Sequence, residues 1–154
     1  LHLSIRRQRQ MCIREVSEII QNQLWIGSKP DPGTYCFDLI VLAAYEYPLR
    51  IVGSIEGPKV IEVGLPDQEL NSQQTARALE AAQTVAKYLS EGKKVCCTCA
   101  MGINRSSLVA ALSLVLLGVS PRRVISRIRE ARGVALTNPW FIEQIYETYL
   151  GLKP

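Results

Sequence analysis

Residues 95–107, which read VCCTCAMGINRSS, decide the fold because the two halves of this segment differ in character. The first half is short and apolar, as in a buried strand, and the second is a loop of small and neutral residues that ends at Arg105 and two serines. The leucine-rich run that follows, LVAALSLVLL, has the length of a buried helix. Because a helix N-terminus carries unpaired N–H groups and partial positive charge, this order predicts a cradle for an anion such as phosphate.

Two side chains of this loop carry the chemistry. Cys99 opens the loop, and Arg105 closes it after five intervening residues. The field of the helix N-terminus stabilises a thiolate held at its mouth, and the guanidinium fork can bind two phosphate oxygens at once. A thiolate that faces a cradled phosphate is a nucleophile, so Cys99 and Arg105 are the first candidate site residues.

Cys99, Arg105 and the following Ser106 resemble the phosphate-binding signature of the cysteine-dependent protein tyrosine phosphatases. Three other segments look like the dual-specificity branch of that superfamily in order and spacing: EIIQNQLWIGS at 18–28, LPD at 65–67 and RGVALTNPWF at 132–141. The resemblance covers nearly the whole chain. It implies a stand-alone, dual-specificity-like protein phosphatase that hydrolyses phosphotyrosine and phosphoserine or phosphothreonine through a phosphocysteine, with no cofactor and no metal.

The catalytic residues that this mechanism needs are Cys99, Arg105, Asp67 and Ser106. The phosphate oxygens would be held by the Arg105 side chain and by backbone N–H groups of the loop residues Ala100, Met101, Gly102, Ile103, Asn104 and Arg105. Asp67 follows an expected strand and either protonates the leaving group or is simply a turn residue; Glu69 is the alternative acid. Ser106 either hydrogen-bonds the thiolate or caps the helix.

One position departs from the pattern of the superfamily. A histidine usually precedes the nucleophile, and this chain has Thr98 there, which puts the orientation of the loop and the reactivity of the thiol in question. Thr98 keeps a hydroxyl that could bond the loop backbone. The departure motivates a second hypothesis, a pseudophosphatase that binds phosphoresidues without hydrolysis. The only histidine, His2, lies near the terminus, which argues against a Cys–His protease pair.

The neutral loop also bears on the substrate. Because it contains no lysine, we expect phosphorylated proteins as partners rather than highly anionic inositol phosphates. An RNA 5′-phosphatase of the same superfamily is the alternative, since the G-x-N-R order resembles the RNA triphosphatases and two groups of arginines could follow a phosphate backbone. These groups are Arg6, Arg7, Arg9 and Arg14, and Arg122, Arg123, Arg127, Arg129 and Arg132.

Length and composition favour one compact unit. The chain has 154 residues, of which 47% are hydrophobic, and a formal net charge of +4. We expect a single catalytic domain over residues 1–154, with residues 1–14 as a basic arm or helix. The longest strongly apolar run, 108–117, is about half of the roughly 20 residues that a membrane span needs, so no membrane is expected. Nothing in the sequence predicts an oligomeric state.

The five cysteines, without a signal peptide, indicate a reducing compartment rather than a disulfide framework. We therefore expect a protein of the cytoplasm, or of the nucleus. Cys96 and Cys97 either pack as small hydrophobic residues, or Cys97 forms a protective disulfide with Cys99 on oxidation. A metal site in this cluster is disfavoured because a fourth ligand at suitable spacing is lacking.

The hydrophobic pattern predicts an α/β fold, and the resemblance implies the protein tyrosine phosphatase type, with a central, mostly parallel mixed sheet flanked by helices. Strands are expected at 16–20, 24–26, 37–44, 60–65 and just before Cys99, and helices at 71–92, 105–117, 121–133 and 139–150. Ser120 and Asn138 are expected to cap the last two helices, and Asn71 or Ser72 the first. Trp140 and Phe141 are expected in the core, and residues 45–57 stay unassigned.

Overall fold

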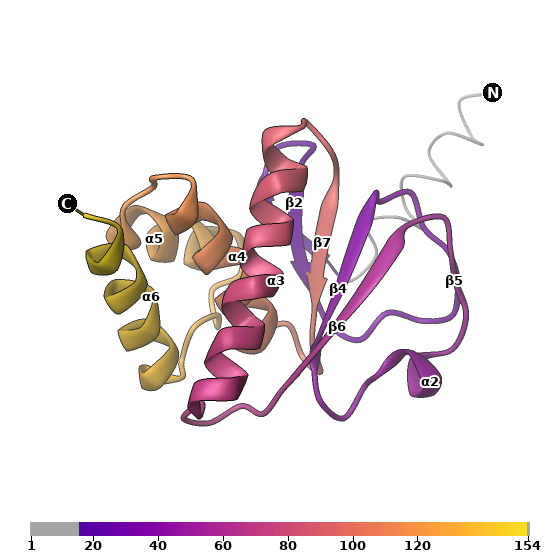
Figure 1. Cartoon of the computed structure of the whole chain (residues 1–154). Helices are drawn as coiled ribbons and strands as arrows, with labels where there is room; N and C mark the ends of the chain where they lie inside the picture. The colour runs from indigo at the N-terminus through magenta and orange to yellow at the C-terminus, as the bar shows by residue number, and fades with distance from the viewer. Residues whose placement is uncertain (1–15, 154) are drawn as a thin grey trace.

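A five-stranded sheet forms the centre of the computed structural model, which describes residues 16–153 (Figure 1). Its strands, in spatial order, are β1 (Val16–Ile20), β2 (Leu24–Gly27), β7 (Val95–Thr98), β4 (Leu39–Ala44) and β6 (Lys59–Leu65). β1 is antiparallel to β2, and the other neighbouring pairs are parallel. The three inner strands β2, β7 and β4 are buried throughout, as expected for parallel strands that are covered on both faces.

The two faces of the sheet carry layers of different thickness (Figure 1). One face is covered by the helices α3 (Ser72–Ser90), α4 (Arg105–Leu116), α5 (Pro121–Ala131) and α6 (Pro139–Leu152). The other carries the short helix α2 (Leu49–Val52) and a small parallel sheet of β3 (Gly33–Thr34) and β5 (Ile55–Glu56). Successive residues of β7 accordingly enter different cores: Cys97 lies in the larger cluster under the helices, and Cys96 in the smaller one.

Helix α4 lies in the middle of the thick layer, where it contacts α3, α5, α6 and three strands. Its residues from Arg105 to Val115 are all buried, because a helix that is apolar on every side is stable only when it is surrounded. α4 follows β7 directly through the loop 99–104, so the most buried helix of the described chain fixes the position of that loop.

The structure confirms the expected fold class and most of the expected elements. α3 begins with a complete capping box between Asn71 and Gln74, and Asn138 caps α6. Ser120 is the N-cap residue of α5 and Pro121 its first residue, as expected, but the Ser120 side chain makes no cap hydrogen bond. The unassigned stretch contains α2 and β5.

The structure departs from the sequence-based expectations at Trp140 and at Cys36. Phe141 is fully buried, but Trp140 is 47% exposed and was wrongly placed in the core. Cys36 is disulfide-bonded, which departs from the expected fully reduced set, whereas Cys96, Cys97 and Cys99 are free thiols. The basic segment 1–14 lies outside the described residues. Within residues 16–153, no helix combines the length and the apolar character that crossing a bilayer requires.

Candidate active site

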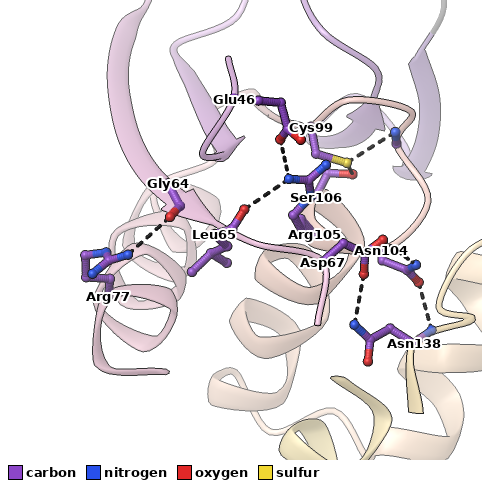
Figure 2. Close-up of polar contacts among 11 residues, drawn as sticks. Glu46, Gly64, Leu65, Asp67, Arg77, Cys99, Asn104, Arg105, Ser106 and Asn138 are labelled. Carbon is purple, nitrogen blue, oxygen red and sulfur yellow. Dashed lines mark hydrogen bonds and ion pairs between the residues drawn. The ribbon is translucent and has the colours of Figure 1, made fainter. Parts of the chain in front are cut away.

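The candidate site lies where four parallel strands end, at one edge of the sheet. Gly27 ends β2, Cys99 follows β7, and Glu46 and Asp67 come shortly after the ends of β4 and β6. The carboxyl ends of parallel strands are where open α/β sheets place their ligands, because the connecting loops converge there. The strand order therefore brings together residues that are far apart in the sequence (Figure 2).

Cys99 is held by two hydrogen-bonding groups of its own loop. Its Sγ atom accepts a hydrogen bond from the Gly102 N–H at 3.2 Å and lies 3.2 Å from Ser106 Oγ. Both groups can donate to a thiolate, and Cys99 stands next to the N-terminus of α4, where the helix field favours negative charge. Ser106 lies inside α4 and not at its N-cap, and its hydroxyl forms a hydrogen bond with the Cys99 sulfur.

The curvature of the loop depends on Gly102, whose φ of +67° lies in the left-handed region. A Cβ atom there would come within 2.7 Å of the Gly27 carbonyl carbon and 3.0 Å of Arg132 Cζ. Arg132 donates to the Met101 carbonyl at 2.9 Å and to Ser17 Oγ at 3.2 Å, which ties the loop to β1. The loop is therefore packed too tightly at this point for any residue with a side chain.

Most loop amides point to no protein acceptor. Among residues 16–153, only Gly102 of the predicted phosphate-binding set donates its backbone N–H, and it donates to the sulfur. The N–H groups of the others have no hydrogen-bond partner in that part of the chain: Ala100, Met101, Ile103, Asn104 and Arg105. Unpaired N–H groups at the start of a helix are the donors that an anion requires.

Arg105 is almost completely buried, and one edge of its guanidinium is engaged. Nη1 forms an ion pair with Glu46 and donates to the Leu65 carbonyl at 3.1 Å (Figure 2). Nε and Nη2 have no hydrogen-bond partner among the described residues, so the other edge of the fork is available to a ligand. Sequence reasoning missed Glu46, although its place just after a central strand at this edge could have indicated it.

Asp67 is exposed at the surface, but both of its carboxylate oxygens are engaged. Asn104 Nδ2 donates to Oδ2 at 3.0 Å, and Asn138 Nδ2 donates to Oδ1 at 2.9 Å. Figure 2 shows the Asp67 side chain turned toward these two residues. Glu69 lines a hollow beside Trp140 and makes no hydrogen bond to the loop, so the geometry favours Asp67 over Glu69.

The residues just before Cys99 point away from the cradle or into the core. Thr98 Oγ1 donates to the Val41 carbonyl at 2.8 Å, so it bonds a neighbouring strand. The sequence had suggested a bond to the loop backbone instead, and that expectation was wrong. Burial raises the pKa of the Cys96 thiol to about 12, against an opposing effect of Arg132. Burial, with the neighbouring Cys96 and Cys99, raises the pKa of Cys97 well above its usual value. Both thiols therefore remain protonated near neutral pH, and a disulfide between Cys97 and Cys99 stays a prediction.

No protein-family model matches the sequence, and no curated protein matches it either. Solved structures do match its fold, over most of both chains. A mouse putative dual specificity phosphatase, complexed with zinc tungstate, has a TM-score of 0.75 at 19% identity and covers 90% of this chain and 88% of its own. The active form of Tk-PTP has a TM-score of 0.69 at 23% identity, with coverage of 89% and 97%. PTPMT1 in complex with PI(5)P has a TM-score of 0.70 at 17% identity, with coverage of 89% and 96%.

The chain has the fold of the small protein tyrosine phosphatases. At identities this low, the likeness establishes the architecture and leaves the activity to the residues of this chain. Within residues 16–153, no group of three or more His, Cys, Asp or Glu side chains is arranged to hold a metal ion. The side chains that this edge of the sheet brings together are those of the cysteine, the arginine and the two carboxylates.

Proposed function

We propose that the chain is a phosphatase that hydrolyses phosphate monoesters through a covalent phosphocysteine on Cys99. One observation carries the proposal: the Cys99 sulfur lies 3.2 Å from both the Gly102 nitrogen and the Ser106 hydroxyl, beside the unpaired amides at the N-terminus of α4. This arrangement stabilises a thiolate and a phosphate in the same small space. The phosphatase fold supports the proposal at the level of architecture.

In the first step, the Cys99 thiolate attacks phosphorus. The S–P bond forms as the bond from phosphorus to the leaving oxygen breaks, and Asp67 gives its proton to that oxygen. The free edge of the Arg105 fork and the loop amides hold the three other phosphate oxygens, on which charge is spread in the transition state. The products of this step are an alcohol or phenol and a phosphocysteine.

In the second step, a water attacks the phosphocysteine. Asp67 now accepts a proton from the water as the new P–O bond forms, and the S–P bond breaks to release inorganic phosphate. The electron pair returns to Cys99 Sγ, where the Ser106 hydroxyl and the Gly102 N–H donate to it. Both groups therefore stabilise the sulfur as a leaving group, and the cycle ends with the original thiolate.

The substrate class that we propose is a singly phosphorylated protein side chain. The loop residues between Cys99 and Arg105 carry no charge, so the loop supplies no lysine for additional phosphate groups. Met101, the most exposed loop residue at 66%, offers a sulfur-containing apolar surface that suits a peptide better than a polyphosphate. Comparing turnover of phosphopeptides, inositol phosphates and 5′-triphosphorylated RNA tests this choice directly.

Of the five arginines in and just after α5 on which the RNA hypothesis rests, Arg122 and Arg123 are exposed, and the other three are engaged within the fold. Arg127 donates to the Ile19 carbonyl at 2.8 Å, and Arg129 donates to the Leu136 carbonyl at 2.9 Å. Arg132 holds residues 99–105, hereafter the phosphate loop, against β1. These three guanidinium groups secure neighbouring segments of the fold, and the basic residues near the N-terminus lie outside the described residues. We therefore keep a protein substrate as the proposal.

The decisive experiment is Cys99→Ser, assayed with p-nitrophenyl phosphate in the presence of a metal chelator. A serine hydroxyl is far less ionised than a thiol in the same field, so we expect no measurable turnover, while inorganic phosphate still binds. Cys96→Ala is the matched control, because Cys96 points into the opposite core and its loss leaves the site intact.

Retention of turnover by Cys99→Ser would exclude the covalent mechanism. Absence of turnover by the unaltered protein with every phosphate ester, combined with tight binding of a phosphopeptide, would instead identify a pseudophosphatase that captures phosphoresidues.

A further inference from the structure

Asp67 is held by two carboxamides from two different segments of the chain. Asn104, in the phosphate loop, donates to one carboxylate oxygen at 3.0 Å, and Asn138, at the start of α6, donates to the other at 2.9 Å. Both asparagines are buried, with exposed fractions of 8% and 7%. These three residues, hereafter the acid latch, join the loop after β6, the phosphate loop and the segment before α6.

The Asn104 amide cannot turn around, because its oxygen is already committed. Oδ1 of Asn104 accepts hydrogen bonds from the backbone N–H groups of Thr137 at 2.8 Å and Asn138 at 3.0 Å. Its Nδ2 group also donates to Thr137 Oγ1 at 3.1 Å. A flipped amide would place N–H against N–H at two positions, so the NH₂ group is obliged to face Asp67.

The Asn138 amide is fixed in the same way by helix α6. Its Oδ1 atom caps the helix by accepting from the N–H groups of Trp140 at 3.0 Å and Phe141 at 3.4 Å. Only its NH₂ group is left for Asp67. Asp67 therefore faces two N–H donors of fixed orientation, and a carboxyl group satisfies both of them, because each of its oxygens accepts one hydrogen bond and one oxygen can still carry a proton.

We infer that Asn104 and Asn138 are positioning residues that hold Asp67 at the rim of the phosphate loop for proton transfer to the leaving group. Asn104 immediately precedes Arg105, so the latch relates the acid to the group that binds the phosphate. Errors of about 1 Å in such a geometry reduce rates strongly, which explains why two buried side chains are used to fix one exposed carboxylate. This inference rests on the proposed phosphatase activity.

Asn138→Ser tests the latch without altering the phosphate loop. Serine is as good a helix cap as asparagine, so it keeps an acceptor for the Trp140 and Phe141 N–H groups. Its side chain is too short to donate to Asp67, so only the latch bond is removed. Asn71→Ser is the matched control: Asn71 caps α3 with the same type of hydrogen bond, to the Gln74 N–H at 2.8 Å, and contacts no part of the site.

The readout is the dependence of kcat/KM on the leaving group. A poorly held acid matters most when the leaving group is a poor one, so we expect roughly a tenfold loss on a phosphoserine peptide and less than about a twofold loss on p-nitrophenyl phosphate. Combining Asn138→Ser with Asp67→Ala should give no loss beyond that of Asp67→Ala alone, because Asn138 acts through Asp67. Asn71→Ser should leave both substrates unaffected.

Three outcomes separate this inference from the proposed function. Equal losses on both substrates, or a further loss in the Asp67→Ala background, would overturn the latch and leave the phosphatase standing. No Cys99-dependent turnover by the unaltered protein would overturn the function itself, and the latch with it. If Asn138→Ser does not fold, Asn138→Thr keeps an oxygen acceptor for the helix cap and is likewise too short to donate to Asp67, and it must then show a selective loss of about the same size.

Discussion

Glu46 and Asp67 occupy matching places in the molecule but are held in different ways. Each follows the end of a parallel strand, and each is bound by one of two consecutive residues of the phosphate loop. Glu46 meets the guanidinium of Arg105, which is a charged partner. Asp67 meets only the neutral amide groups of Asn104 and Asn138. The two sides of the loop therefore differ in whether an added negative charge alters the ion pairing of the carboxylate.

If phosphate binds as proposed, the electrostatic balance on the Glu46 side changes. A phosphate dianion at the free edge of Arg105 adds negative charge near the Glu46 carboxylate, so the two anions compete for one guanidinium. On the Asp67 side, the partners are neutral and their orientation is set by backbone N–H groups. We propose that the Arg105 side adjusts the affinity for phosphate, whereas the Asn104 side fixes the geometry of proton transfer.

The largest effect is expected for Arg105→Lys. An ammonium group cannot present a planar fork to two phosphate oxygens while also bonding Glu46 and the Leu65 carbonyl, so kcat/KM for p-nitrophenyl phosphate should fall by roughly 10²–10³-fold. Arg77→Lys is the matched control, because Arg77 donates to the carbonyls of Val63 and Gly64, which lie near the end of β6, the strand that also contains Leu65 (Figure 2). It should lower the free energy of unfolding by about 1 kcal/mol and leave the rate unchanged.

A near-normal rate for Arg105→Lys would show that the arginine only supports the fold. The proposal that the Arg105 side of the loop adjusts the affinity for phosphate would then fail.

Glu46→Gln is expected to have a smaller effect than Arg105→Lys, and it should strengthen the binding of phosphate where Arg105→Lys weakens it. Glutamine keeps an acceptor for Arg105 but removes the negative charge, so inorganic phosphate should inhibit at a concentration roughly 3- to 10-fold lower. Glu62→Gln removes the same charge from a carboxylate that bonds the Leu49 N–H at 2.6 Å, at the start of α2, and should leave inhibition unchanged. Weaker inhibition of Glu46→Gln would mean that Glu46 chiefly orients Arg105 and does not compete with phosphate.

The fold and the nucleophile loop were predictable from sequence because they depend on local patterns. The apolar run before Cys99, the leucine-rich run after Arg105 and the caps at Asn71 and Asn138 each report on their own segment. These patterns gave the α/β class, the strand-loop-helix order and the placement of Cys99, Arg105 and Ser106 in one loop. Asp67 was reached through its position just after a strand together with the resemblance of the LPD segment, and the parallel sheet brings that strand end to the same edge as Cys99.

The partners of these residues were not predictable, because they come from contacts between distant segments. The position of Glu46 just after a central strand could have placed it at this edge of the sheet, but no local pattern identified Arg105 as its partner. Asn138 was recognised as a helix cap, but its second hydrogen bond, to Asp67, depends on where α6 begins relative to the loop after β6. Trp140 was misplaced because the amphipathic pattern of α6 does not show which side faces the core.

The smallest effect on the rate is expected for Thr98, the residue just before Cys99. Thr98 replaces the histidine that is usual in the superfamily, which had put the orientation of the loop in question. If the phosphate loop is held from its two flanks, the hydrogen bond from Thr98 to the Val41 carbonyl at 2.8 Å stabilises the sheet and not the site. Thr98→Val keeps the shape and removes this buried bond, so the free energy of unfolding should fall by about 1 kcal/mol in a urea titration. The kcat/KM for p-nitrophenyl phosphate should stay within about twofold, since no loop atom loses a partner. Thr84→Val, which removes an exposed hydroxyl bonded to the Glu80 carbonyl at 3.3 Å, should change neither quantity measurably. A large loss of rate in Thr98→Val would show that the strand behind Cys99 shares in holding the loop, and the division between its two flanks would then be incomplete.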